Sequence, residues 1–142
     1  MLVAKIHQVS GRIFARKLKE YHINEINPAQ GRILFVLWAQ DGIPIRTLAE
    51  KTLLEKSTLT SMLDRLEEMG YVRREPSQED RRAIIIRRTD KDRNFQKLYN
   101  AVSEDMTRLF YKGMSAQEID QLETGLRRIL DNVVSYESEY KG

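Results

Sequence analysis

The chain has 142 residues, of which 41% are hydrophobic and 32% are charged, and its formal net charge is +3. This length and apolar content predict one domain, or one compact unit with an extra layer for association. Only three prolines and seven glycines occur, which leaves little room for low-complexity sequence. The absence of cysteine excludes disulfides and thiol chemistry, and the isolated histidines His7 and His22 form no cluster that would hold a metal, a cofactor or a catalytic centre.

The first part of the chain predicts two helices. Apolar residues recur at spacings of three and four over residues 2–22, which is typical of an amphipathic helix. A largely buried helix over 28–40 follows, with Asn27 as its N-cap and Pro28 in its first turn. The N-terminal segment lacks the apolar core of a signal peptide, and no run approaches the roughly 18 residues that span a bilayer. We therefore expect a cytoplasmic protein without membrane contact.

A short extended piece and a short helix come next. The extended piece is residues 43–45, where a proline stands between two isoleucines. Thr47 and Glu50 match a capping box, in which the two side chains satisfy free backbone donors at a helix start. This pattern predicts a helix over 47–52.

A second short helix follows a turn at residues 53–54. It begins near Lys56 or Ser57 and runs to Met69, after which Gly70 supplies a left-handed stop. Two short helices joined by a tight turn form a helix-turn-helix, which places its second helix in the major groove of DNA.

The two faces of this second helix differ in character. One face is an apolar stripe of Leu59, Met62, Leu63, Leu66 and Met69. The other face is small and rich in hydroxyls, which can approach base edges closely and donate or accept there. Capping is the stronger interpretation of Ser57 taken alone, whereas the four hydroxyls together favour DNA contact. The candidate DNA-binding residues of the helix are Lys56, Ser57, Thr58, Thr60, Ser61 and Arg65.

Residues 71–88 predict a β-hairpin. Two strand-like runs, 71–75 and 83–88, flank a turn-forming run over 76–80. No acid occurs in 81–89, whose basic residues are Arg81, Arg82, Arg87 and Arg88. A basic hairpin beside a helix-turn-helix reaches phosphates or the minor groove. A solvated edge strand protected by charge explains the same composition equally well.

The remainder of the chain predicts two long helices. Thr89 opens the first, which runs to about Lys112, and Gly113 ends it. Ser115 and Glu118 form a capping-box signal for the last helix. Apolar residues then follow at alternating spacings of four and three, which is a heptad seam. The seam favours dimerisation over the core of a monomeric bundle, and it consists of Leu122, Leu126, Ile129, Val133, Tyr136 and Tyr140.

The run LAEKTLLEKSTLTSMLDRLEEMGYV, followed by a wing with Asp80-Arg81-Arg82, resembles the MarR family of bacterial and archaeal winged-helix regulators. The element order fits nearly the whole chain, and Pro28-Ala-Gln30 is a weaker match. The resemblance implies a mainly α fold: a winged helix-turn-helix with a small β-hairpin wing plus N- and C-terminal dimerisation helices. It also implies one unit over 1–142, in which 28–89 binds DNA while 1–27 and 90–142 dimerise.

The resemblance further implies a homodimer that binds a palindromic operator in double-stranded DNA, usually as a repressor released by a small ligand. By position, Arg82 matches the wing-tip arginine that enters the minor groove, Asp80 the acid that braces it through a salt bridge, and Arg81 a phosphate contact. The chain departs from the pattern at Ser61, where a basic residue is frequent. It departs again where the wing strand usually ends Leu-Thr and a glycine follows, because this chain has Arg88-Thr89 and then Asp92.

The family's ligand pocket lies between the dimer helices and the winged domain. Phe14, Tyr21, Trp38 and Leu109 are the candidates to line it, although residues of these types are more often simply core. A small aromatic or anionic ligand fits such a lining, and a regulator without any ligand stays open as well.

Two other classes of function compete with DNA binding. An enzyme is excluded because the sequence has no cysteine, no histidine cluster, no glycine-rich phosphate loop and no spaced carboxylate dyad. A winged helix that serves as a protein-interaction module stays as the alternative. It predicts weak DNA binding without sequence preference.

Overall fold

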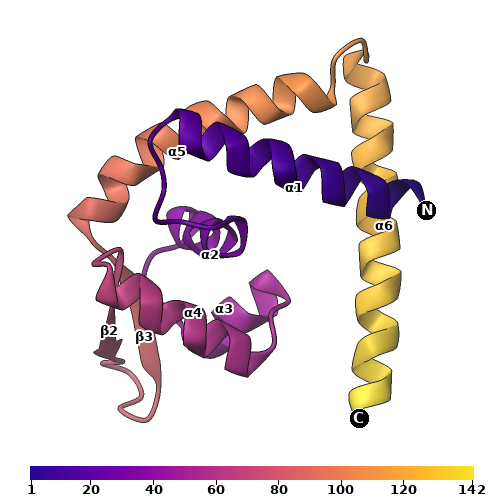
Figure 1. Cartoon of the computed structure of the whole chain (residues 1–142). Coiled ribbons are helices and arrows are strands. Elements are labelled where there is room, and N and C mark those ends of the chain that lie inside the picture. The colour runs from indigo at the N-terminus through magenta and orange to yellow at the C-terminus, as the bar shows by residue number, and fades with distance from the viewer. The chain divides into compact units, whose positions relative to one another are not determined.

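The computed structural model describes residues 1–142 as six helices and one small sheet (Figure 1). It confirms the predicted mainly α fold of a winged helix-turn-helix. The chain divides into two compact units, Met1–Glu104 and Asp105–Gly142. None of its helices combines the length and apolarity needed to cross a bilayer. The elements are α1 Leu2–Glu20, α2 Pro28–Ala39, β1 Ile43–Pro44, α3 Ile45–Thr52, α4 Lys56–Glu68, β2 Val72–Pro76, β3 Ile84–Arg88, α5 Asp90–Phe110 and α6 Ala116–Lys141.

The start of α2 confirms the predicted cap and adds a partner to it. Asn27 accepts a hydrogen bond from the backbone N–H of Gln30 at 2.8 Å, and the Gln30 side chain accepts from the backbone N–H of Asn27 at 3.0 Å. These reciprocal bonds form a capping box, in which two free donors of the helix start are satisfied at once. The first turn of α2 is therefore fixed from both sides.

The capping box predicted at Thr47 is wrong, because α3 begins two residues earlier. Pro44 is the N-cap in an extended conformation, and the helix start has no side-chain cap bond. Thr47 thus lies inside the first turn. Glu50 is directed instead at Arg46, four residues before it, with their charged atoms 3.6 Å apart.

The turn between α3 and α4, the start of α4 at Lys56 and its end are as predicted, whereas the residue that caps α4 differs. Leu53 makes the turn in a left-handed conformation with φ of 56°, and Gly70 ends α4 with φ of 85°. The N-cap of α4 is Glu55, without a side-chain bond. Ser57 therefore lies inside the helix, and its interpretation as the cap is wrong.

The sheet is antiparallel with the order β1-β3-β2, so β3 is the central strand. Its register pairs Val72 with Arg88 at the base of the hairpin and Pro76 with Ile84 near the tip. Ile86 is fully buried, whereas Ile84, on the same face, is 45% exposed. The difference arises because the hairpin extends beyond the core toward its tip (Figure 1).

An aromatic cluster and a leucine layer form the core of the first unit. Trp38 of α2 packs edge-on against Tyr99 of α5, with their ring centroids 4.9 Å apart, and Phe14 of α1 packs on the same tyrosine at 5.5 Å. Gly31 allows this close approach, because a Cβ there would lie 3.0 Å from the Tyr99 ring. The leucine layer is fully buried and comprises Leu34, Leu37, Leu48, Leu59, Leu63 and Leu66.

The second unit contains the end of α5 and all of α6. Ser115 and Glu118 form the predicted capping box at the start of α6. No residue of α6 is buried. Its apolar seam is 43–84% exposed and comprises Leu122, Leu126, Ile129, Val133, Tyr136 and Tyr140, and Leu130 beside the seam is exposed as well.

Candidate nucleic-acid interface

The outer face of α4 carries the predicted hydroxyls, and its inner face holds it in the core. Leu59, Leu63 and Leu66 are fully buried below the helix. The Thr60 hydroxyl donates to the carbonyl of Lys56 at 2.8 Å, so it retains only accepting capacity toward a ligand. The exposed residues of the face are Lys56, Ser57, Thr58, Thr60, Ser61, Asp64 and Arg65.

A groove of about 420 Å³ lies between this face and the start of α2. The capping box described above holds Asn27 and Gln30 in place at its edge. Sequence reasoning did not assign these two side chains to the site, and its only signal was the weak family match at residues 28–30. The groove is lined by Asn27, Gln30, Ser57, Thr58, Ser61, Met62 and Arg65.

The tip of the wing is a tight loop held by its own backbone and by Asp80. Asp80 accepts a hydrogen bond from the backbone N–H of Arg82 at 3.0 Å, and the Ser77 hydroxyl accepts from the backbone N–H of Asp80 at 3.3 Å. The expected salt bridge between the Asp80 and Arg82 side chains is not formed. A carboxylate reaches the backbone N–H two residues on most easily, which leaves the guanidinium in solvent.

The arginines of the wing strands are paired within the protein. Arg73 and Arg87 both contact Glu75, at 2.8 and 3.2 Å. Arg74 contacts Glu67 of α4 at 3.0 Å. The sequence predicted positive charge along the whole hairpin. Because the strand arginines are paired with acids, unpaired positive charge is found only at the tip. There, the exposed Arg81 and Arg82 have no acidic partner.

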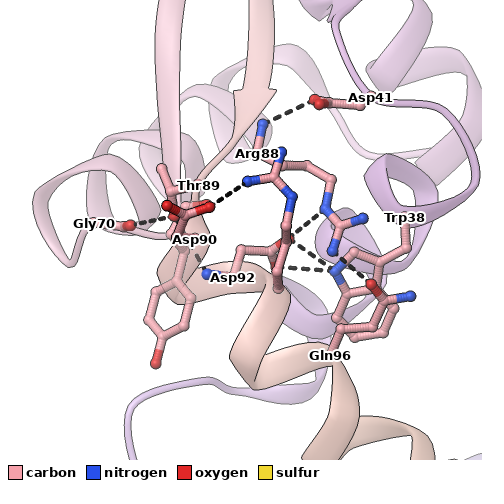
Figure 2. Close-up of polar contacts among 10 residues, drawn as sticks. Trp38, Asp41, Gly70, Arg88, Thr89, Asp90, Asp92 and Gln96 are labelled. Carbon is pink, nitrogen blue, oxygen red and sulfur yellow. Dashed lines mark hydrogen bonds and ion pairs between the residues drawn. The ribbon is translucent and has the colours of Figure 1, made fainter.

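Arg88, whose role the sequence left open, points into the protein at the base of the wing (Figure 2). Its Nε lies 2.5 Å from Asp92, which is fully buried, and its Nη2 donates to Gln96 at 2.5 Å. The indole N–H of Trp38 donates to the same Asp92 carboxylate at 2.9 Å. The backbone N–H of Arg88 donates to Asp41 at 2.9 Å. The end of β3 is thereby bonded to α2, to α5 and to the loop before β1.

Thr89 starts α5 as predicted and also joins it to the end of α4. Its hydroxyl accepts from the backbone N–H of Asp92 at 3.3 Å and donates to the carbonyl of Gly70 at 2.6 Å. The helix that leaves the wing is thus anchored at the point where α4 stops.

The four candidates for a ligand pocket have different surroundings. Phe14 and Trp38 belong to the aromatic cluster of the core. Tyr21 is partly buried next to the end of α1. Leu109 is exposed and belongs to the second unit.

A different groove, of about 410 Å³, lies between the α1–α2 loop and the start of α5. Tyr71 donates its hydroxyl to Glu25 at 2.9 Å, and the Lys91 ammonium lies 3.3 Å from Glu25 and 4.6 Å from the Tyr71 ring centroid. Burial and the bond to Glu25 raise the pKa of Tyr71 well above its ordinary value. The bonds from Tyr71 and Lys91 lower the pKa of Glu25. No sequence pattern had indicated this cluster.

Residues 26–84 match the model of the MarR family. Over 129 residues the chain is 31% identical to the HTH-type transcriptional regulator TtmR of Methylorubrum extorquens. The matched region covers 91% of this chain and 60% of TtmR. The chain is 29% identical over 100 residues to the organic hydroperoxide resistance transcriptional regulator of Bacillus subtilis, and this match covers 70% of this chain and 67% of that regulator. The chain therefore spans less than two thirds of the TtmR length.

Two solved structures have the same fold. A mutant MarR from E. coli, complexed with operator DNA, superposes with a TM-score of 0.80 at 25% identity, covering 91% of both chains. BpsR from Bordetella bronchiseptica superposes with a TM-score of 0.82 at 19% identity, covering 92% of this chain and 91% of that one.

Proposed function

Since this chain belongs to the MarR family, we propose that it is a DNA-binding transcriptional regulator that acts on a palindromic operator as a homodimer. One observation carries the proposal. The arginines of the wing strands are neutralised internally, whereas Arg81 and Arg82 at the tip are left without partners. An unpaired cation on a protruding hairpin is suited to a phosphate or to a narrow minor groove. The operator complex of E. coli MarR, at 25% identity, adds support.

In the proposed complex, α4 lies in the major groove with its hydroxyl face toward the bases. Serine and threonine hydroxyls donate or accept at base edges, so they suit several base pairs. Lys56 and Arg65 at the margins of the face bind phosphates and fix the register. Arg82 enters the minor groove, and Arg81 binds a phosphate beside it.

The proposed homodimer accounts for the apolar surface of the helical ends. The α6 seam and Leu130 together leave seven large apolar or aromatic side chains exposed, and the first turns of α1 expose Leu2, Val3 and Ile6 as well. Soluble monomers rarely expose apolar patches of this extent. A second copy related by a two-fold axis would cover this apolar surface with the same surface of its partner. Two α4 helices related by the same axis would require a palindromic site.

Family membership is also the basis for the proposed mode of control. The protein represses the genes beside its operator, and a small aromatic or anionic ligand releases it. Phe14, Tyr21 and Trp38, which all belong to the first unit, are retained as its proposed lining. The core packing of Phe14 and Trp38 means that a ligand there has to displace ring contacts.

The test is a selection of duplexes from a random pool by the full-length protein, followed by fluorescence anisotropy on the selected duplex. We expect a two-fold symmetric consensus with half-sites about 10 bp apart, because adjacent major grooves on one side of DNA are one turn apart. Affinity should fall steeply with salt. A scrambled duplex of equal composition is the control. Equal affinity for both duplexes would favour the protein-interaction module instead.

A further inference from the structure

Two positions at which the sequence departs from the MarR pattern lie in direct contact at the base of the wing. Arg88 stands where an apolar residue is usual, and Asp92 stands where a glycine is usual. Their side chains form an ion pair of 2.5 Å, in which Asp92 is 0% and Arg88 12% exposed. The two departures are therefore the two halves of one buried interaction.

We propose that Arg88, Asp92 and Trp38 form a polar junction that positions the wing for DNA binding. The proposal rests on the function proposed above and adds to it three positioning residues that touch no DNA themselves. Trp38 belongs to the junction because its indole N–H donates to both carboxylate oxygens of Asp92, at 2.9 and 3.1 Å. The junction links β3 to α2 and α5 (Figure 2).

The tip arginines take their position from the base of the hairpin, because their side chains form no ion pair and only the backbone N–H of Arg82 is bonded, to Asp80 within the same loop. β2 is attached to α4 through Glu67, which accepts from the backbone N–H of Arg74 at 2.8 Å. β3 is attached through the junction and through Asp41, which accepts from the backbone N–H of Arg88 at 2.9 Å. A loosened junction therefore displaces Arg82 relative to α4 even when the contacts of α4 itself are intact.

A buried ion pair is weak evidence for stability, so the role proposed for this pair is to orient the wing. Removing one partner leaves the other charge buried and uncompensated, whereas replacing both partners often leaves the free energy of unfolding unchanged. The planar guanidinium of Arg88 also donates to Gln96, so its orientation is fixed from two sides. If the junction positions the wing, changes at Asp92 and at Arg82 should therefore have non-additive effects on DNA affinity.

The test is a double-mutant cycle between Asp92→Asn and Arg82→Ala, with affinity measured by anisotropy on the duplex selected above. Asp92→Asn keeps the size of the side chain and an acceptor for Trp38, but it removes the charge that holds Arg88. In the wild-type background Arg82→Ala should weaken binding about tenfold. In the Asp92→Asn background the same change should weaken it by less than about twofold, because Arg82 is no longer held in place.

Asp90→Asn is the matched control, because Asp90 forms an exposed pair with Arg93 on the same helix at 2.7 Å. The full effect of Arg82→Ala should persist in that background. If circular dichroism shows that Asp92→Asn is unfolded, Trp38→Phe replaces it, since it removes the N–H donor but keeps a ring. Equal losses in both backgrounds would overturn the junction, and so would an Arg82→Ala change without effect in the wild type. A selection without a preferred duplex overturns the proposed function itself, so the two failures are distinct.

Discussion

Arg82 differs from the arginines of the wing strands in the freedom of its guanidinium. If it enters the minor groove, Arg82→Ala should weaken operator binding by about 1–3 kcal/mol and leave the dimer mass unchanged. Anisotropy and sedimentation equilibrium measure the two quantities. Arg73→Ala is the control, because Arg73 already pairs with Glu75 at 2.8 Å. Equal losses from the two changes would mean that general charge, and not a positioned contact, drives binding.

Tyr71 gives a residue-scale prediction for alkaline pH. Burial first, and then its bond to Glu25, raise the pKa of Tyr71. The stability linked to this shift is fully present below the ordinary tyrosine pKa of about 10, and it is lost as pH rises through the higher value in the folded protein. Glu25→Gln should therefore shift ionisation of Tyr71 to lower pH, because it removes the negative charge from its partner.

Absorbance of tyrosinate at 295 nm follows the ionisation of all six tyrosines in a pH titration of the folded protein, and the difference between the wild-type and Glu25→Gln curves reports the change at Tyr71. Glu20→Gln on α1 is the control and should leave the curve unchanged, since Glu20 lies outside the lining of the Tyr71 groove. An identical curve for wild type and Glu25→Gln would show that burial alone causes the shift.

At the scale of the element, we expect the two faces of α4 to have separate roles, the buried face in stability and the exposed face in DNA binding. Leu63→Ala should lower the free energy of unfolding by about 2–5 kcal/mol, because it leaves a cavity in a fully buried layer. Ser61→Ala, two residues earlier on the exposed face, should leave the unfolding midpoint within about 0.5 kcal/mol and lower operator affinity. Urea denaturation and anisotropy measure the pair. A Ser61→Ala change that destabilised the protein would contradict this separation.

Helix ends were predictable where the signal is local. Asn27 and Gly70 were identified because a cap and a left-handed stop depend on neighbouring residues only. Thr47 and Ser57 carry the same kind of signal, but other residues took the cap positions. Pro44 is the extended N-cap of α3, which therefore begins two residues before Thr47. Glu55 is the N-cap of α4, which begins at Lys56 as predicted but places Ser57 inside the helix.

The candidate site was predictable only in the part that lies along one stretch of chain. The hydroxyl face of α4 follows from helical periodicity, and Arg82 follows from the turn of the hairpin. The interactions around Arg88 could not be predicted from local sequence, since Trp38 lies 54 residues before Asp92 and no local pattern relates the two residues. The sequence showed Arg88 and Asp92 only as separate departures from a family pattern.

For the whole molecule, the exposed seam of α6 predicts that one charge placed within it disrupts association. Leu126→Glu should convert the dimer to a monomer, because it buries a carboxylate at an apolar interface. Thr124→Glu is the matched control, since Thr124 lies two residues away on the other side of the helix. Sedimentation equilibrium measures the mass, and circular dichroism shows whether the fold persists. A wild-type protein that remains monomeric at micromolar concentration would contradict the proposed dimer.

The separation of the two faces of α4 also bears on how such proteins diverge. The buried leucines keep the helix in place whatever stands on its outer face, so Ser57, Thr58 and Ser61 can be exchanged at little cost to folding. Mutations at these positions can then accumulate one at a time without passing through unfolded intermediates. A duplicated copy of this gene could acquire a new target sequence while keeping its core, its wing and its partner surface.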